Sequence, residues 1–141
     1  MRFNWTRAIA LTVVCCAGSV SMGQVSSNVT VLVVTDLGDI TVAIDTEHAP
    51  QTAANFLRYV DAGAYDDGQF HRTVTMQNQP NNDVRIEVIQ ASVNSGRSEE
   101  SFDPIQLERT SVTGLRHIDG AISMARGGPD TATSSFFFCI G

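Results

Sequence analysis

The distribution of apolar residues along the chain predicts a protein built mainly from β-strands. β-Branched residues dominate 29–35 and recur through 40–45, and a Gly-containing turn at 36–39 separates the two segments, as in a β-hairpin. Segment 29–35 is apolar on both faces, whereas 40–45 alternates, so we expect the first strand to be more enclosed than its partner. The pattern predicts four further strands, at 69–76, 84–92, 120–126 and 134–140.

One helix is expected after the hairpin. Apolar residues recur there with helical spacing, namely Ala49, Ala53, Phe56, Leu57, Val60 and Ala64. Pro50 fits the first turn because an N–H at that position has no partner within a helix, and Gly63 is a suitable stop. The apolar stripe should cover an open end or flank of the sheet. The amide-rich segment 77–83 is expected to be a loop, and 94–119 a long surface excursion with a short helical turn.

The first 23 residues have the pattern of a secretory signal peptide. Arg2 and Arg7 lie near the start of an uncharged, mostly apolar run, 8–20, which is shorter than the ~20 residues that a membrane-spanning helix needs. Small residues follow at 21–23, the positions that a signal peptidase recognises. The sequence therefore predicts cleavage after residue 23 and export to the periplasm or the cell exterior.

Two alternatives for the N-terminal segment stay open. It is compatible with an ordinary core helix, and with a lipid anchor at Cys15 or Cys16. A bulky Val14 precedes Cys15, where a lipidation site requires a small residue, so the cleavable signal peptide is the favoured interpretation. The mature chain would then begin at Gln24 and form one domain, 24–141.

Composition and charge exclude several classes of protein. The 141 residues are 43% hydrophobic and 17% charged, which is typical of one globular domain rather than of a disordered chain. Nine Lys+Arg against 15 Asp+Glu give a net charge of −6, so binding to nucleic acid has no electrostatic support. All nine cations are arginine, which excludes lysine chemistry. Only Cys139 lies beyond the predicted signal peptide, so no disulfide framework is expected.

Most catalytic motifs are absent. The histidines, at 48, 71 and 117, lack metal-ligand spacing, and the chain has no phosphate-binding glycine loop, so the sequence predicts no metal and no cofactor. Two segments stand out. Phe70-His71-Arg72 places an arginine within a strand, with Phe70 and Arg72 expected on one face, and 123–140 contains three successive phenylalanines. A solvated strand position and core packing are the purely structural alternatives for these two segments.

Taken together, these segments resemble the cyclophilin family of peptidyl-prolyl cis–trans isomerases. The similarity runs from about Val31 to the last residue and comprises, in order, Ala49–Phe56, Tyr65-Asp66, Phe70-His71-Arg72, Ile89-Gln90 and Ser123–Arg126 leading to Ser134–Phe137. It implies a mainly β fold, a closed eight-stranded antiparallel barrel capped by helices, with a substrate groove on its outer face. Six of those strands and a capping helix are recognisable. We therefore expect the sequence to be incomplete at its C-terminus, its sheet to be open, and the fragment 24–141 alone to be aggregation-prone and inactive.

The resemblance also implies roles for individual residues. It assigns catalysis to Arg72 and Gln90. It assigns substrate contacts to Phe70, Ala125, Arg126, Ser135 and Phe137. Ala125 and Arg126 would contact the residues that precede the proline, and Phe137 would line the proline pocket. The implied partners are proline-containing polypeptides, with no nucleic acid and no membrane insertion after signal cleavage, and we expect a monomer.

The sequence also departs from the family pattern. Eighteen positions separate Arg72 from Gln90, so the amide-rich loop is an insertion. Glu87 stands where the family generally has an aromatic, Ala91-Ser92 replaces a glycine pair, and Ser135 replaces a glutamine. These changes support an alternative function, a cyclophilin-like module that binds proline-containing peptides with weak or no turnover.

Overall fold

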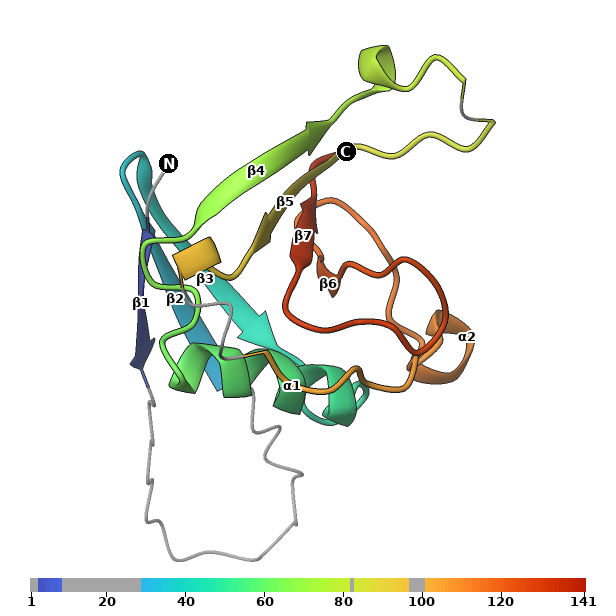
Figure 1. Cartoon of the computed structure of the whole chain (residues 1–141). Coiled ribbons are helices and arrows are strands. Elements are labelled where there is room, and N and C mark those ends of the chain that lie inside the picture. Colours follow the sequence, from blue (N-terminus) through green and yellow to red (C-terminus); the bar gives the residue numbers. More distant parts are fainter. Residues whose placement is uncertain (1–2, 9–28, 82, 97–100) are drawn as a thin grey trace, which may run out of the picture.

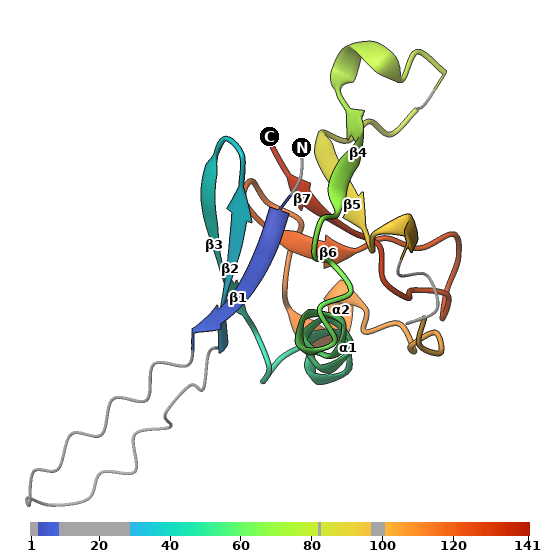
Figure 2. The ribbon, with the colours of Figure 1, turned by 60° about the vertical axis from the view of Figure 1, so that its left-hand side comes forward.

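The computed structural model describes residues 3–8, 29–81, 83–96 and 101–141, which contain two antiparallel sheets (Figure 1). The first sheet has the order β1-β2-β3, with bounds Phe3–Ala8, Val29–Thr35 and Gly38–Ile44. The second has the order β4-β5-β7-β6, with bounds Gln69–Val74, Val88–Ser92, Phe136–Cys139 and Ile122–Met124. The two sheets lie side by side, with helix α1, Pro50–Asp61, across one end (Figure 2).

The predicted hairpin is confirmed. β2 pairs with β3 through a tight turn in which Gly38 has φ of 128°, a conformation that side chains rarely adopt. Val31 and Val33 on β2 are fully buried because their side chains face the main hydrophobic core. Edge strand β3 has exposed residues on one face, as its alternating pattern predicts.

Helix α1 closes one end of the core, as expected from its apolar stripe. Phe56 on the helix packs against Tyr65 and Phe136, with ring centroids 5.7 and 5.5 Å away, and the Tyr65 and Phe136 rings meet edge to face at 5.2 Å. The Tyr65 hydroxyl donates to the Ser134 carbonyl at 2.6 Å. Burial raises the pKa of Tyr65 well above its ordinary value, and Tyr59 raises it further. This aromatic cluster ties the helix end of the core to β7.

In its described part, the polar segment 94–119 is a surface excursion, as expected, and contains the short helix α2, Thr110–Thr113, but it is attached along α1. The Phe102 amide donates to the Tyr59 hydroxyl at 2.9 Å, and the Arg58 guanidinium lies 3.6 Å from the centre of the Phe102 ring. Further on, Ile105 forms a bridge with Ala132. These contacts place the excursion opposite the β6–β7 connection.

Glu108 caps helix α1 from a distant part of the sequence. The helix begins after Ala49, which offers no side-chain cap, and its first turn contains no acidic residue. The Glu108 carboxylate instead accepts hydrogen bonds from the backbone N–H groups of Gln51 and Thr52, at 3.0 and 2.7 Å. A negative charge at a helix N-terminus is also favoured by the helix dipole.

We therefore expect Glu108→Ala to lower the free energy of unfolding by about 1–2 kcal/mol, because it removes an N-terminal cap. Glu108→Gln, which retains one acceptor, should lose less. Urea unfolding of the full-length protein measures both. Asp103→Asn, which removes a negative charge from an exposed position of the same excursion, is the control and should leave stability unchanged. Equal stability of Glu108→Ala and the control would show that the cap contributes nothing.

The connection between β4 and β5 differs from its prediction. β4 ends at Val74, a 3₁₀ turn follows at Met76–Asn78, and β5 begins only at Val88, so 84–87 are not a strand. The buried Gln79 side chain explains the difference. Its amide donates to the carbonyls of Thr75 and Ile86, at 2.8 and 2.6 Å, and accepts from the Ile86 N–H at 3.2 Å. One side chain thus satisfies backbone groups that a longer ladder would otherwise pair.

Residues 3–8, which the sequence assigns to the start of a signal peptide, form β1 and pair with β2 along their whole length. The predicted cleavage site lies outside the described residues, so the signal peptide remains a prediction. No described helix is both long and apolar enough to cross a bilayer.

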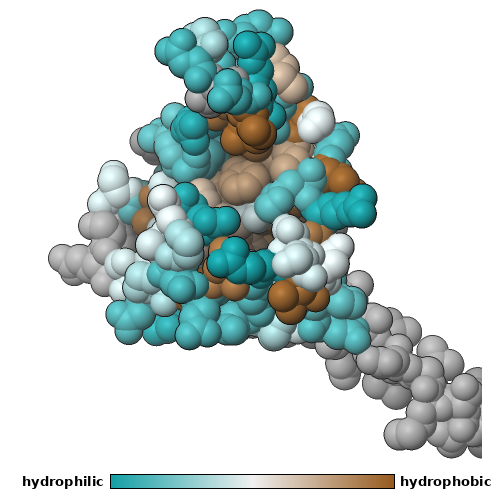
Figure 3. Space-filling model, turned by 90° about the vertical axis from the view of Figure 1, so that its right-hand side faces the viewer, coloured by the Kyte–Doolittle hydropathy of each residue, from teal (hydrophilic) through white to brown (hydrophobic). Residues whose placement is uncertain are grey.

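The two sheets share no ladder in the described parts of the chain, which agrees with the open sheet expected from the sequence. A largely apolar cavity of about 650 Å³ lies between them and is lined by side chains that include Val42, Ile44, Ile122 and Phe138. Apolar residues also gather in a hollow on the face shown in Figure 3. Part of the apolar interior is therefore accessible from outside.

Candidate active site on the four-stranded sheet

One row of residues crosses the four-stranded sheet from edge to edge. Arg72 on β4 is the register partner of Gln90 on β5, Gln90 is the partner of Phe137 on β7, and Phe137 is the partner of Ser123 on β6. Register partners in neighbouring strands point to the same face. Arg72 Nη1 donates to Gln90 Oε1 at 2.9 Å. The three residues that the sequence singles out most strongly, Arg72, Gln90 and Phe137, therefore lie together.

Phe70 does not lie on this face, which corrects the expectation that Phe70 and Arg72 share one. The register shifts between the two residues, so a β-bulge interrupts the alternation. Phe70 pairs with the buried Ala91 and packs against the main core, with its ring 6.2 Å from that of Phe138. The bulge turns Arg72 to the outside and leaves Phe70 inside. Phe70 therefore supports the strand from the core side.

An apolar patch lies next to the row. Val74, Val88 and Cys139 are buried there, and Ala121 and Phe137 pack against them. We call these five residues the apolar floor. Burial raises the pKa of the Cys139 thiol, and Asp119 raises it further, so the sulfur stays protonated and is a poor nucleophile. The floor offers an apolar surface beside a guanidinium, without a reactive group.

His117 is a site residue that no sequence pattern indicates. Its ring stacks on Phe137, with centroids 5.7 Å apart and an interplanar angle of 23°, and its Nε2 lies 3.0 Å from Ser123 Oγ. It comes from the irregular end of the excursion, where no periodic pattern fixes the direction of a side chain. His117 thus forms one wall beside the Phe137 ring.

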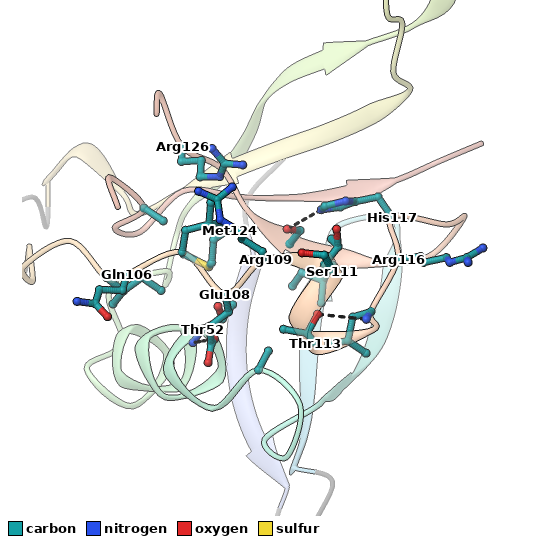
Figure 4. Close-up of a pocket in the computed structure, with 18 of the residues that line it drawn as sticks. Thr52, Gln106, Glu108, Arg109, Ser111, Thr113, Arg116, His117, Met124 and Arg126 are labelled. Carbon is teal, nitrogen blue, oxygen red and sulfur yellow. Dashed lines mark hydrogen bonds between the residues drawn. The ribbon is translucent and has the colours of Figure 1, made fainter. Parts of the chain in front are cut away.

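The remaining predicted residues lie where β6 and β7 join their connecting loop. The Ala125 N–H donates to the Ser135 carbonyl at 2.8 Å, which extends the β6–β7 pairing beyond the row. Arg126 is exposed and, with Phe137, Ser123 and His117, lines a cavity of about 620 Å³ (Figure 4). Ala125, Arg126 and Ser135 therefore lie at one end of the candidate groove, and the apolar floor lies toward the other.

Comparison with known proteins agrees with this geometry. The sequence profile of the family described as "Cyclophilin type peptidyl-prolyl cis-trans isomerase/CLD" matches residues 30–141. The chain belongs to the cyclophilin family. Peptidyl-prolyl cis-trans isomerase-like 1 of Neurospora crassa is 34% identical over 113 residues, which cover 78% of this chain and 63% of the relative.

Two further relatives give the same picture. Peptidyl-prolyl cis-trans isomerase A of Dickeya dadantii is 32% identical over 111 residues, covering 78% of this chain and 53% of that protein. Peptidyl-prolyl cis-trans isomerase ppi1 of Schizosaccharomyces pombe is 34% identical over 109 residues, covering 75% and 64%. The chain thus spans between 53% and 64% of the length of these relatives.

The amide-rich loop between β4 and β5 borders a second, smaller cavity beside the site. Residues 72–74 and 78–81 line a cavity of about 380 Å³, so the amide-rich loop lies directly next to Arg72. Glu87, where the resemblance leads us to expect an aromatic residue, is half-buried, and its carbonyl accepts from the Ile140 N–H at 3.0 Å. The structure therefore holds Glu87 at the end of β7, close to the apolar floor.

The described residues contain no group of three His, Cys, Asp or Glu side chains placed to hold a metal ion. Arg72 is exposed and forms no ion pair within the described parts of the chain, so its charge is not neutralised by a neighbouring carboxylate. What the arrangement offers chemically is a fixed cation, an amide that orients it, and an apolar surface with an aromatic ring.

Proposed function

We propose that this cyclophilin is a peptidyl-prolyl cis–trans isomerase in which Arg72 and Gln90 act on the X–Pro bond and Phe137 holds the proline. The observation that carries the proposal is the row that places Arg72, Gln90 and Phe137 on one face of the sheet. The names of the three relatives above support it.

The reaction requires what this site contains. Amide resonance imposes a rotational barrier of ~18–20 kcal/mol, and uncatalysed isomerisation of X–Pro takes tens to hundreds of seconds. No covalent bond is made or broken, so no nucleophile is needed. In the twisted transition state the amide nitrogen regains its lone pair, and a donor placed near that pair stabilises it. A guanidinium keeps its charge at physiological pH and donates in a planar fork.

Gln90 fixes the direction of that fork. Because its Oε1 accepts from Arg72 Nη1, one side of the guanidinium is held and the other N–H groups remain available to substrate. Preorganised donors of this kind lower the barrier because they need no rearrangement during the reaction. Phe137, with His117 against its ring and the other residues of the apolar floor beside it, would hold the proline ring while the preceding carbonyl rotates.

The direct test is exchange spectroscopy of an X–Pro peptide by NMR, with the full-length protein. We expect cis–trans exchange at catalytic protein concentration, much faster than for the peptide alone. Absence of acceleration, with the peptide bound, would instead support the second candidate, a module that binds proline-containing peptides. That candidate is favoured by Glu87, which puts an acidic residue near the apolar floor, and by Ser135 in place of a glutamine.

We further propose that the protein is exported and assists the folding of other exported polypeptides as a monomer. The support is the N-terminal pattern, a short apolar run followed by small residues. The exported product is expected to begin at Gln24, which intact-mass measurement or N-terminal sequencing of secreted or periplasmic material would show. A cytosolic product that retains Met1 would contradict the proposal.

A further inference from the structure

Two arginines at the loop end of the groove have no partner that neutralises them. Arg109 and Arg126 line the 620 Å³ cavity together with Phe137, and in Figure 4 their side chains project toward the same end of it, whereas Arg116 points away. Both arginines are exposed, and neither guanidinium group forms an ion pair or hydrogen bond within the parts of the chain that the structure describes. The pair is unexpected in a chain with a net charge of −6.

The carboxylates in the same cavity are already engaged. Glu108 accepts from two backbone N–H groups at the start of α1. Asp130 Oδ1 accepts from the Leu107 N–H at 2.7 Å. Neither carboxylate forms an ion pair with the two guanidinium groups in the described parts of the chain. Arg116 also lines the cavity, so three arginines stand against the two carboxylates. The formal charge of the lining is therefore positive.

We infer that Arg109 and Arg126 form a subsite for an acidic side chain of the substrate, located before the proline in the peptide. The inference rests on the proposed function, in which Phe137 receives the proline. β6 ends at Met124, and Arg126 lies two residues further on. A peptide that lies along β6 with its proline on Phe137 would therefore place the residues before the proline next to these arginines. Guanidinium groups bind carboxylates through paired N–H donors, which suits this role.

The test compares peptides that contain Ala-Glu-Ala-Pro-Phe with the same peptides carrying Gln or Lys instead of Glu. We expect kcat/KM for the Glu peptide to exceed that for the Gln peptide about 5- to 10-fold, since each exposed charge pair contributes ~0.2–1 kcal/mol, and the Lys peptide to be poorest. The preference should shrink at high salt because the pairs are exposed. Moving the Glu to a position after the proline should abolish the preference.

Substitutions of the two arginines test the subsite separately from the catalytic residues. Arg109→Gln should reduce the Glu preference to about 2- to 3-fold. Arg126→Gln should also reduce the preference. A change in overall activity does not affect this test, because the measured quantity is the ratio of kcat/KM for the Glu peptide to that for the Gln peptide. Arg85→Gln removes the same charge from an exposed position in the connection between β4 and β5 and should leave the ratio unchanged.

The outcomes distinguish the two proposals. If the Gln peptide is isomerised and the Glu peptide no faster, the subsite is wrong and the isomerase function stands. If neither peptide is isomerised, the proposed function fails, and titration of the Glu and Gln peptides by NMR still tests the subsite through their dissociation constants. A Glu preference that survives in both arginine variants would also overturn the inference.

Discussion

Arg72→Ala is expected to lower isomerisation of an X–Pro peptide by about 10²–10³-fold, the cost of one preorganised donor in enzymes that stabilise a developing lone pair or charge. Arg72 is exposed, and the one side-chain hydrogen bond that it forms within the described residues goes to Gln90. Its removal should therefore change the free energy of unfolding little. Exchange spectroscopy on the full-length protein measures the rate, and urea unfolding checks the stability.

A conservative variant sharpens this prediction. Arg72→Lys keeps the positive charge but replaces the planar fork with a single ammonium, which cannot both donate to Gln90 and present a fixed donor to substrate. We expect it to recover little of the lost rate. Arg85→Ala, which removes an exposed arginine elsewhere, is the matched control and should be fully active. Unchanged activity in both Arg72 variants would show that the assigned mechanism is wrong.

The sequence predicts the architecture well wherever one local pattern determines the structure. The β2–β3 hairpin and helix α1 are such cases, because a Gly-containing turn, an N-terminal proline and an apolar stripe each act within a few residues. The end of β4 and the start of β5 are poorly predicted. There, the Gln79 side chain pairs with Thr75 and Ile86, and no periodic signal reveals such a contact.

The site follows the same division. The resemblance to the cyclophilin family singles out Arg72, Gln90 and Phe137 as site residues. All three lie on strands, and the sheet register brings them together as expected. Phe70 is misplaced because a bulge depends on pairing across strands and not on the local sequence. His117 and Glu108 come from the irregular excursion. Their partners, Phe137 and the first turn of α1, are distant in the sequence, so only the three-dimensional structure reveals these contacts.

Phe136 and Phe137 are neighbours on β7 and point to opposite faces of the sheet, so we expect their substitutions to have different effects. Phe136 is fully buried in the aromatic cluster with Phe56 and Tyr65. Phe136→Ala is expected to lower the free energy of unfolding by about 3–5 kcal/mol, through lost burial and the cavity that remains. A domain has only ~5–15 kcal/mol in total, so this variant should be largely unfolded or much less stable to urea.

Phe137→Ala should behave in the opposite way. Phe137 is half-buried at the surface of the sheet, so the loss of stability should be about 1–2 kcal/mol. Its ring is the proposed seat of the proline, and loss of that apolar contact should reduce kcat/KM by about 10- to 100-fold. Urea unfolding and exchange spectroscopy on both variants give the comparison. Equal loss of stability from the two substitutions, or full activity of Phe137→Ala, would contradict the division of β7 into a core face and a substrate face.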